Sequence, residues 1–244
     1  MYRIRITLPK RKMVTYRNLD VLHDALIHAW IEAGASSNAV LGSNAAIWHF
    51  GVLGWHYKGQ NRAHTLVVGT PDDLLSRCLS DMKTTAIQYT RALTGEQVDF
   101  SDADIIEDLD PVGPNQNSLG LVLLSPIAIS RTKKEKKGPR WHTSLKEVDL
   151  SQAVNHRLSR LTGQKVSLTV SPDNLNLRSH AKHHTLVQTK ELKNGHKAFV
   201  IGMRSPLVMT GTEKDLRLAW YSGIGEKNRM GFGCVGLAER GIGR

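Results

Sequence analysis

The chain has 244 residues, 40% of them apolar, so it is long enough for one large or two small hydrophobic cores. Lys and Arg number 33 against 22 Asp and Glu, and the net charge of +11 favours a polyanionic partner. Two cysteines without a C-x-x-C pair exclude a disulfide scaffold and a cysteine zinc site, and we expect a cytoplasmic protein. Neither a signal peptide nor a membrane span is evident, so we expect no membrane partner.

The first half of the sequence predicts the order strand, helix, strand, strand, helix. The expected elements are a strand over 2–8, a helix over 19–33, strands over 47–55 and 64–69, and a helix from Pro71 to about Leu93. In the first strand apolar residues alternate with Arg3, Arg5 and Thr7, which predicts one basic face.

Residues 72–110 differ from the rest in charge. They carry ten acidic side chains against three basic ones, so the remainder of the chain is more basic than the net charge indicates. We expect an acidic helical insertion followed by a linker over about 95–117, directed away from a nucleic-acid partner.

The second half predicts a similar order of elements. The expected elements are a strand over 119–129, a helix over 145–161, a strand over 166–170, a hairpin over 184–191 and 197–203, a helix over 212–221 and a strand over 230–237. We therefore expect an α+β chain of two tandem ferredoxin-like (β-α-β-β-α-β, RRM-like) domains, over residues 1–110 and 118–244.

The most specific motif is a glycine-rich loop between the last expected helix and strand. Its glycines are Gly223, Gly225, Gly231 and Gly233, and its cations are Lys227 and Arg229. Glycine lets backbone N–H groups approach a ligand closely, so such a loop could hold phosphates. A dinucleotide fingerprint is excluded because Asn228 replaces a required glycine and the order of helix and strand is reversed. A plain glycine-rich turn remains the alternative.

Further basic segments are candidate contacts for RNA phosphates. The first contains Arg131, Lys133, Lys134, Lys136, Lys137 and Arg140, followed by Trp141, which could stack on a base. The others contain Arg11 and, within a histidine-rich stretch, Arg178 and Lys182. Arg3 and Arg5, on the basic face of the first strand, are also candidate RNA contacts. The histidine-rich stretch lacks the glutamate and the helical histidine pair of a metalloprotease, so we expect no metal site. A solvated loop is the alternative interpretation of the first segment, and incidental composition is the alternative for the histidine-rich stretch.

The helix, the run GIGEKNRMGFG and the final strand together resemble the glycine-rich loop of CRISPR RAMP proteins. More narrowly, they resemble the repeat-processing endoribonucleases that form the sixth Cas family. Residues 22–28, LHDALIH, are similar to the first helix of the type I-E processors, in which a catalytic histidine follows a leucine. By this match His23 is the catalytic candidate. The length of the chain and its acidic insertion depart from the type I-E pattern and favour a type IV processor.

The resemblance implies an endoribonuclease without metal or other cofactor. Such enzymes cut CRISPR precursor RNA at the base of a repeat hairpin by attack of the ribose 2′-hydroxyl, and they retain the mature guide RNA. Histidine can serve as the base or the acid. We expect His23 to act with Tyr16 beside it; His28 is a second candidate, about 140° away around the helix.

The expected partners are CRISPR repeat RNA and other Cas effector subunits. Two alternatives to the nuclease stay open. One is a non-catalytic RNA-binding RAMP subunit of an effector complex, and the other is a basic ferredoxin-like protein that binds DNA or ribosomal RNA. In either case His23 would be an ordinary surface or core-edge histidine.

Overall fold

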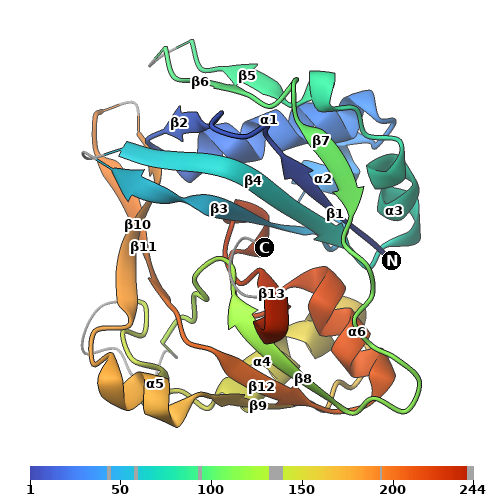
Figure 1. Cartoon of the computed structure of the whole chain (residues 1–244), viewed down its shortest axis with the longest axis vertical. Coiled ribbons are helices and arrows are strands. Elements are labelled where there is room, and N and C mark those ends of the chain that lie inside the picture. The colour runs from blue at the N-terminus through green and yellow to red at the C-terminus, as the bar shows by residue number, and fades with distance from the viewer. Residues whose placement is uncertain (43–44, 58–59, 93–94, 132–139, 193, 241–244) are drawn as a thin grey trace. The chain divides into compact units, whose positions relative to one another are not determined.

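The computed structural model describes residues 1–42, 45–57, 60–92, 95–131, 140–192 and 194–240. The chain forms two compact units (Figure 1). The first contains Met1–Leu109, Gln188–Ala198 and Arg229–Gly231, and the second contains Asp110–Val187, Phe199–Asn228 and Phe232–Arg244. Among the residues that the structure describes, no helix combines the length and the apolar character needed to span a membrane.

The first unit is built on an antiparallel sheet. Its elements are β1 Tyr2–Thr7, β2 Val14–Tyr16, α1 Leu19–Glu32, α2 Ser37–Leu41, β3 His49–Tyr57, β4 Gln60–Thr70, α3 Asp73–Ser80, β5 Gln88–Thr90, β6 Gln97–Asp99 and β7 Asp104–Glu107. The strand order β7-β1-β4-β3 is that of a ferredoxin-like β-α-β-β-α-β unit (Figure 1). The short β2 pairs with β4 beyond the end of β1.

Alternation along the strands decides which side chains enter the core of this unit. Ile4 and Ile6 lie opposite Val68 and Leu66, and all four are fully buried. On β3 the buried Phe50 lies opposite Val68, so it shares the same face of the sheet. Each such side chain contributes about 1.5–3 kcal/mol of burial free energy.

The other face of β1 holds a buried ion pair. The Arg3 guanidinium lies 2.9 Å from Asp108, and Arg5 lies 3.2 Å from the second oxygen of the same carboxylate. The Arg3 and Asp108 side chains are 0% and 1% exposed. The expected RNA contact of Arg3 is therefore wrong, because its charge is already matched inside the unit.

The acidic segment folds differently from the predicted long helix. Helix α3 ends at Ser80, and the chain continues as a 3-10 turn at Thr84–Ala86 and the hairpin β5–β6. Threonine, isoleucine and tyrosine are frequent over residues 84–90, and these residue types favour strands over helices. The segment interpreted as a linker also supplies β7, which pairs with β1 as the fourth strand of the sheet.

The second unit contains another antiparallel sheet. Its elements are β8 Ser118–Leu123, α4 Leu150–Thr162, β9 Thr169–Pro172, α5 Asn174–Ser179, β12 Leu207–Thr210, α6 Glu213–Ser222 and β13 Val235–Leu237. The strand order β13-β8-β12-β9 again follows the ferredoxin-like pattern (Figure 1). The predicted α+β class with tandem ferredoxin-like folds is confirmed.

One strand of this second sheet was assigned to the wrong residues. The predicted hairpin exists as β10 His184–Glu191 and β11 Lys197–Met203, but it forms a separate two-stranded sheet. The third strand of the ferredoxin-like order is β12, which follows Pro206 and pairs with both β8 and β9. Its four residues are too few to produce a clear alternation in the sequence.

The glycine-rich loop connects α6 to β13 with an unusual backbone. Gly223, Gly225, Gly231 and Gly233 have φ values of 69°, 71°, 84° and 69°, and Lys227 has a φ of 61°. A Cβ atom on Gly233 would lie 1.8 Å from the Ile224 carbonyl oxygen. The Asn228 amide group donates to the Ile224 and Phe232 carbonyls at 2.9 Å each, and its oxygen accepts from Arg157. The glycines thus permit a closed loop around a buried asparagine.

We expect Gly233→Ala to lower the free energy of unfolding by more than about 2 kcal/mol. A positive φ alone costs an L-residue roughly 1–2 kcal/mol, and here the methyl group would also overlap the Ile224 carbonyl. Gly163→Ala is the matched control, because Gly163 has a φ of 66° with nothing within 4 Å of the added Cβ. Urea denaturation should show the smaller loss for the control; equal losses would contradict the close approach.

We expect Asp108→Asn to destabilise the chain by about 3 kcal/mol, because it leaves the buried Arg3 without its carboxylate. Asp102→Asn is the matched control, because it also removes one negative charge. The ion pair of Asp102 with Lys12 is exposed and screened by water, so no shift of the unfolding midpoint is expected. Thermal unfolding of the two variants tests the contrast. A stable Asp108→Asn protein would show that the pair is not needed.

Candidate functional site

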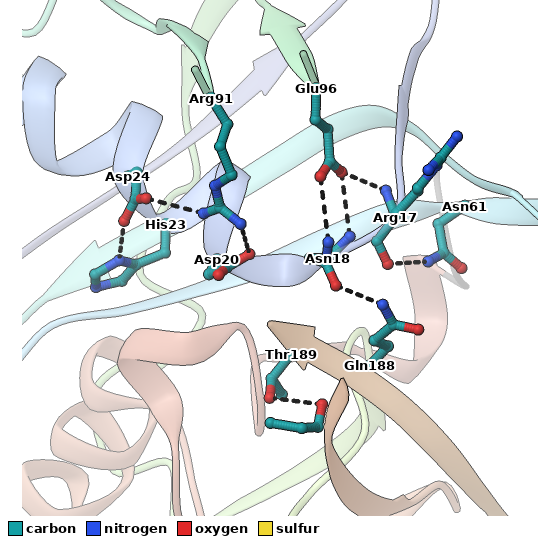
Figure 2. A network of polar contacts seen from close by, with 11 residues as sticks. Arg17, Asn18, Asp20, His23, Asp24, Asn61, Arg91, Glu96, Gln188 and Thr189 are labelled. Carbon is teal, nitrogen blue, oxygen red and sulfur yellow. Dashed lines mark hydrogen bonds and ion pairs between the residues drawn. The ribbon is translucent and has the colours of Figure 1, made fainter. Parts of the chain in front are cut away.

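The His23 imidazole on α1 is held on two sides. Its Nδ1 lies 3.1 Å from the Asp24 carboxylate (Figure 2). Its ring stacks on Trp48 with 5.8 Å between the ring centres. The side chain is 15% exposed. An ionised carboxylate only accepts hydrogen bonds, so Nδ1 carries the proton in this contact. Nε2 is then the nitrogen through which a neutral imidazole can accept a proton.

Asp24 is itself fixed by an arginine from another part of the chain. The Arg91 guanidinium, which follows β5, lies 3.1 Å from Asp24 and 2.8 Å from Asp20 (Figure 2). Burial tends to raise the pKa of Asp24, but His23 and Arg91 outweigh it and lower that pKa below its usual value. For Asp20 burial dominates and raises the pKa, although Arg91 opposes it. Asp24 therefore stays ionised beside His23.

The start of α1 is fixed by a second set of contacts. The Glu96 carboxylate accepts the backbone N–H groups of Arg17 and Asn18, where the helix dipole favours negative charge. The Asn18 side-chain oxygen accepts a 2.6 Å hydrogen bond from the Gln188 amide on β10 (Figure 2). Residues of two hairpins, β5–β6 and β10–β11, thus position the helix that carries His23.

The two other catalytic candidates, Tyr16 and His28, have different surroundings from His23. Tyr16 is buried, at 9% exposure, within β2. His28 is exposed, and its ring stacks on Tyr89 of β5 with 5.3 Å between the ring centres. His28 therefore has different neighbours from His23, as expected from their angular separation on the helix.

The roles of Asp24 and Arg91 in holding the His23 imidazole were not predicted from the sequence. Asp24 is the next residue after His23, so the pairing could have been noticed in the sequence. Arg91 lies 67 residues away from Asp24, in a segment interpreted as helix, and no sequence pattern indicates the contact.

In the second unit the glycine-rich loop is joined to the base of the basic segment. The Glu226 carboxylate accepts hydrogen bonds from the Ser130 N–H at 2.9 Å and hydroxyl at 2.6 Å. The Glu226 N–H donates to the Ala128 carbonyl, and Ser130 forms a β-bridge with Trp141. The exposed Lys227 therefore lies on a loop that is anchored at Ala128 and Ser130. Lys133, Lys134, Lys136 and Lys137 lie outside the described residues.

Several of the residues expected to contact RNA instead contact other residues of the protein. Trp141 is 6% exposed, so its expected stacking on a base is wrong; instead the Arg140 guanidinium lies 5.1 Å from its ring centre. Arg131 lies 3.8 Å from Glu147. Arg229, which belongs to the first unit, donates to the Val40 and Gly42 carbonyls, and burial lowers its pKa.

The glycine-rich loop also differs from the expected phosphate cradle. The N–H groups of Ile224, Glu226, Phe232 and Gly233 all donate to backbone carbonyls, so these four are not available to a phosphate. Gly223, Gly225, Gly231 and Gly233 are buried. Their positive φ values serve the closed loop, and Lys227 is its exposed cation.

The remaining basic candidates lie at the surface. Arg11, Arg140, Arg178, Lys182 and Lys227 are exposed. In the histidine-rich stretch His183 accepts the Leu145 N–H at 2.9 Å and is buried, so that ring supports the fold. Within the described ranges, no group of three or more His, Cys, Asp or Glu side chains could hold a metal ion.

Comparisons with known proteins agree with these folds. A family model described as CRISPR associated protein Cas6, C-terminal, matches residues 110–237. No curated protein sequence matches the chain. Among solved structures, "An RAMP protein binding different RNA substrates" is 15% identical, with a TM-score of 0.64, over 97% of this chain and 99% of that one.

Two further solved structures share the fold along nearly the whole chain. "Characterization of a Cas6-related gene from Pyrococcus furiosus" is 13% identical with a TM-score of 0.66, and "CRISPR associated protein Cas6" is 16% identical with a TM-score of 0.60. Each covers 97% of this chain and 98% of its own. Since the family model spans more than half of the sequence, the chain belongs to the Cas6 family of CRISPR-associated proteins.

Proposed function

We propose that the chain is an endoribonuclease that cleaves CRISPR precursor RNA within the repeat, at the base of a hairpin, and keeps the mature guide RNA. Membership of the Cas6 family and the net charge of +11 support an RNA substrate. The observation that carries the catalytic part is the His23 imidazole held through Nδ1 by Asp24. A fixed and oriented imidazole is what proton transfer requires and what a purely structural subunit does not need.

The proposed reaction uses the RNA's own ribose as nucleophile and no metal ion. The 2′-oxygen forms a bond to the scissile phosphorus as the bond to the 5′-oxygen breaks, which gives a cyclic phosphate and a 5′-hydroxyl product. His23 exchanges a proton through Nε2, either as the base for the 2′-hydroxyl or as the acid for the leaving oxygen. When the ring is protonated, Asp24 stabilises the imidazolium.

Binding is proposed to depend on the exposed cations. Arg178, Lys182 and Lys227 project from the surface without the buried ion pairs that hold Arg3 and Arg5. Contacts of this kind fix the position of RNA phosphates without reading the sequence. Retention of the guide would let other Cas effector subunits assemble on the same RNA.

We expect His23→Ala to lower the single-turnover cleavage rate by about 10²–10⁴-fold while repeat-RNA affinity stays unchanged. The wild-type protein should cut in EDTA and should leave a substrate with 2′-deoxyribose before the scissile phosphate intact. Denaturing gels and filter binding measure the two quantities. A rate unaffected by His23→Ala would exclude this histidine, and no cleavage by wild type would favour the non-catalytic RAMP subunit.

We expect Asp24→Asn to slow cleavage on the order of 10-fold while repeat-RNA affinity stays unchanged. The reason is that the amide no longer favours the imidazolium; Arg91 and Asp20 remain nearby in both proteins. Asp20→Asn also removes one carboxylate partner of Arg91, but it leaves the contact between Asp24 and His23 in place. It should lose less rate; equal losses of rate for the two variants would contradict a positioning role for Asp24.

A further inference from the structure

Trp55 differs from the other tryptophans in its exposure. The chain has five tryptophans, and Trp30, Trp48, Trp141 and Trp220 are between 0% and 6% exposed. Trp55, near the end of β3, is 49% exposed. A large aromatic side chain placed half in water leaves an apolar π-face uncovered by the residues around it.

The strand register shows which face of the sheet carries Trp55. On β3 the Phe50 ring lies 6.2 Å from Trp48, which in turn lies 6.0 Å from Trp30 of α1. Side chains alternate along a strand, so Phe50 is directed towards α1 and Trp55, five residues later, towards the opposite face of the sheet. That face is buried at Arg3, Leu53 and Val67 and becomes exposed at Trp55. Exposed aromatic side chains of the sheet stack on unpaired bases in RRM-type domains.

A β-bulge fixes the surroundings of the indole ring. The pairing of β3 with β4 shifts between Leu53 and Gly54, which leaves His64 as the extra residue. Its ring lies 6.0 Å from that of Trp55. A Cβ atom on Gly54 would lie 1.7 Å from the Arg62 carbonyl oxygen, so the close approach of the two strands at this point requires glycine.

The charge beside Trp55 suits a polyanion. Arg62 of β4 pairs directly with Trp55 on one side and with the exposed Thr15 of β2 on the other. Paired residues of neighbouring antiparallel strands share a face, so the Arg62 and Trp55 side chains leave the sheet on the same side. The Arg62 guanidinium also contacts the Met13 sulfur at 3.8 Å. Burial lowers the pKa of His64, which makes that ring an uncharged aromatic neighbour near neutral pH.

We propose that Trp55, flanked by Arg62 and His64, is a stacking site for an unpaired nucleobase of the bound RNA. The assignment rests on the proposed RNA-binding function but not on catalysis by His23. The ligand is single-stranded because a base inside a duplex has both π-faces covered by its neighbours. Arg62 would lie near the adjoining phosphate, whereas Trp55 contacts the base irrespective of its identity.

Tryptophan fluorescence tests the site, since iodide should reach Trp55 and not the four buried indoles. A ten-nucleotide oligouridine should quench the emission and protect it from iodide, whereas a blunt ten-base-pair RNA duplex should protect it far less. Trp55→Ala should weaken oligouridine binding about 10-fold. Trp55→Phe should bind nearly as well as wild type, because phenylalanine also stacks.

Leu74→Ala is the matched control, because Leu74 is an exposed apolar residue of the same unit, at 72% exposure, and should leave affinity unchanged. Equal affinity of Trp55→Ala and wild type, equal protection by duplex, or no binding of oligouridine would each overturn the site. If Trp55 is protected but no repeat RNA is cut, the stacking site stands and the nuclease fails. If repeat RNA is cut but Trp55 is not protected, the nuclease stands and the stacking site fails.

Discussion

The Arg91 guanidinium between Asp20 and Asp24 is the contact on which the candidate site depends. It is 14% exposed and joins the β5–β6 hairpin to the first two turns of α1. Two carboxylates so close together would repel each other, and the arginine between them makes the arrangement stable. Asp24 can then hold His23 with its second oxygen. The orientation of the imidazole is thus determined by a segment far away in sequence.

Most of the fold could be predicted from local patterns. The alternation over 2–8, the helical spacing over 19–33 and the Asn194–Gly195 turn indicated the correct element types, and the glycine loop does join a helix to a strand. The failures lie where local signals are short. β7 and β12 have four residues each, and they become strands because β1 and β8 offer them partners.

The candidate site was predicted less well, because burial follows from tertiary pairing rather than from residue type. The alternation in β1 correctly placed Arg3 and Ile4 on opposite faces of the sheet. It could not show that Arg3 would form a buried ion pair with Asp108. Trp141 is predicted from the sequence as a stacking residue, but its side chain is 6% exposed. Trp55 lies in a segment predicted as a strand, yet the bulge and the arginine that define its surroundings come from β4.

The cationic side chains of this chain have two roles: some form contacts within the protein, and others stay exposed to solvent. Arg3, Arg91 and Arg229 are used internally, where a planar, weakly hydrated guanidinium can match several oxygens at once. Lys182 and Lys227 stay exposed, as expected for a strongly hydrated ammonium group on a flexible stem. Net charge therefore indicates the class of partner, but it overstates the number of cations that can reach an RNA phosphate. In this chain the exposed lysines, together with exposed arginines such as Arg178, are the better guide to the proposed RNA-binding surface.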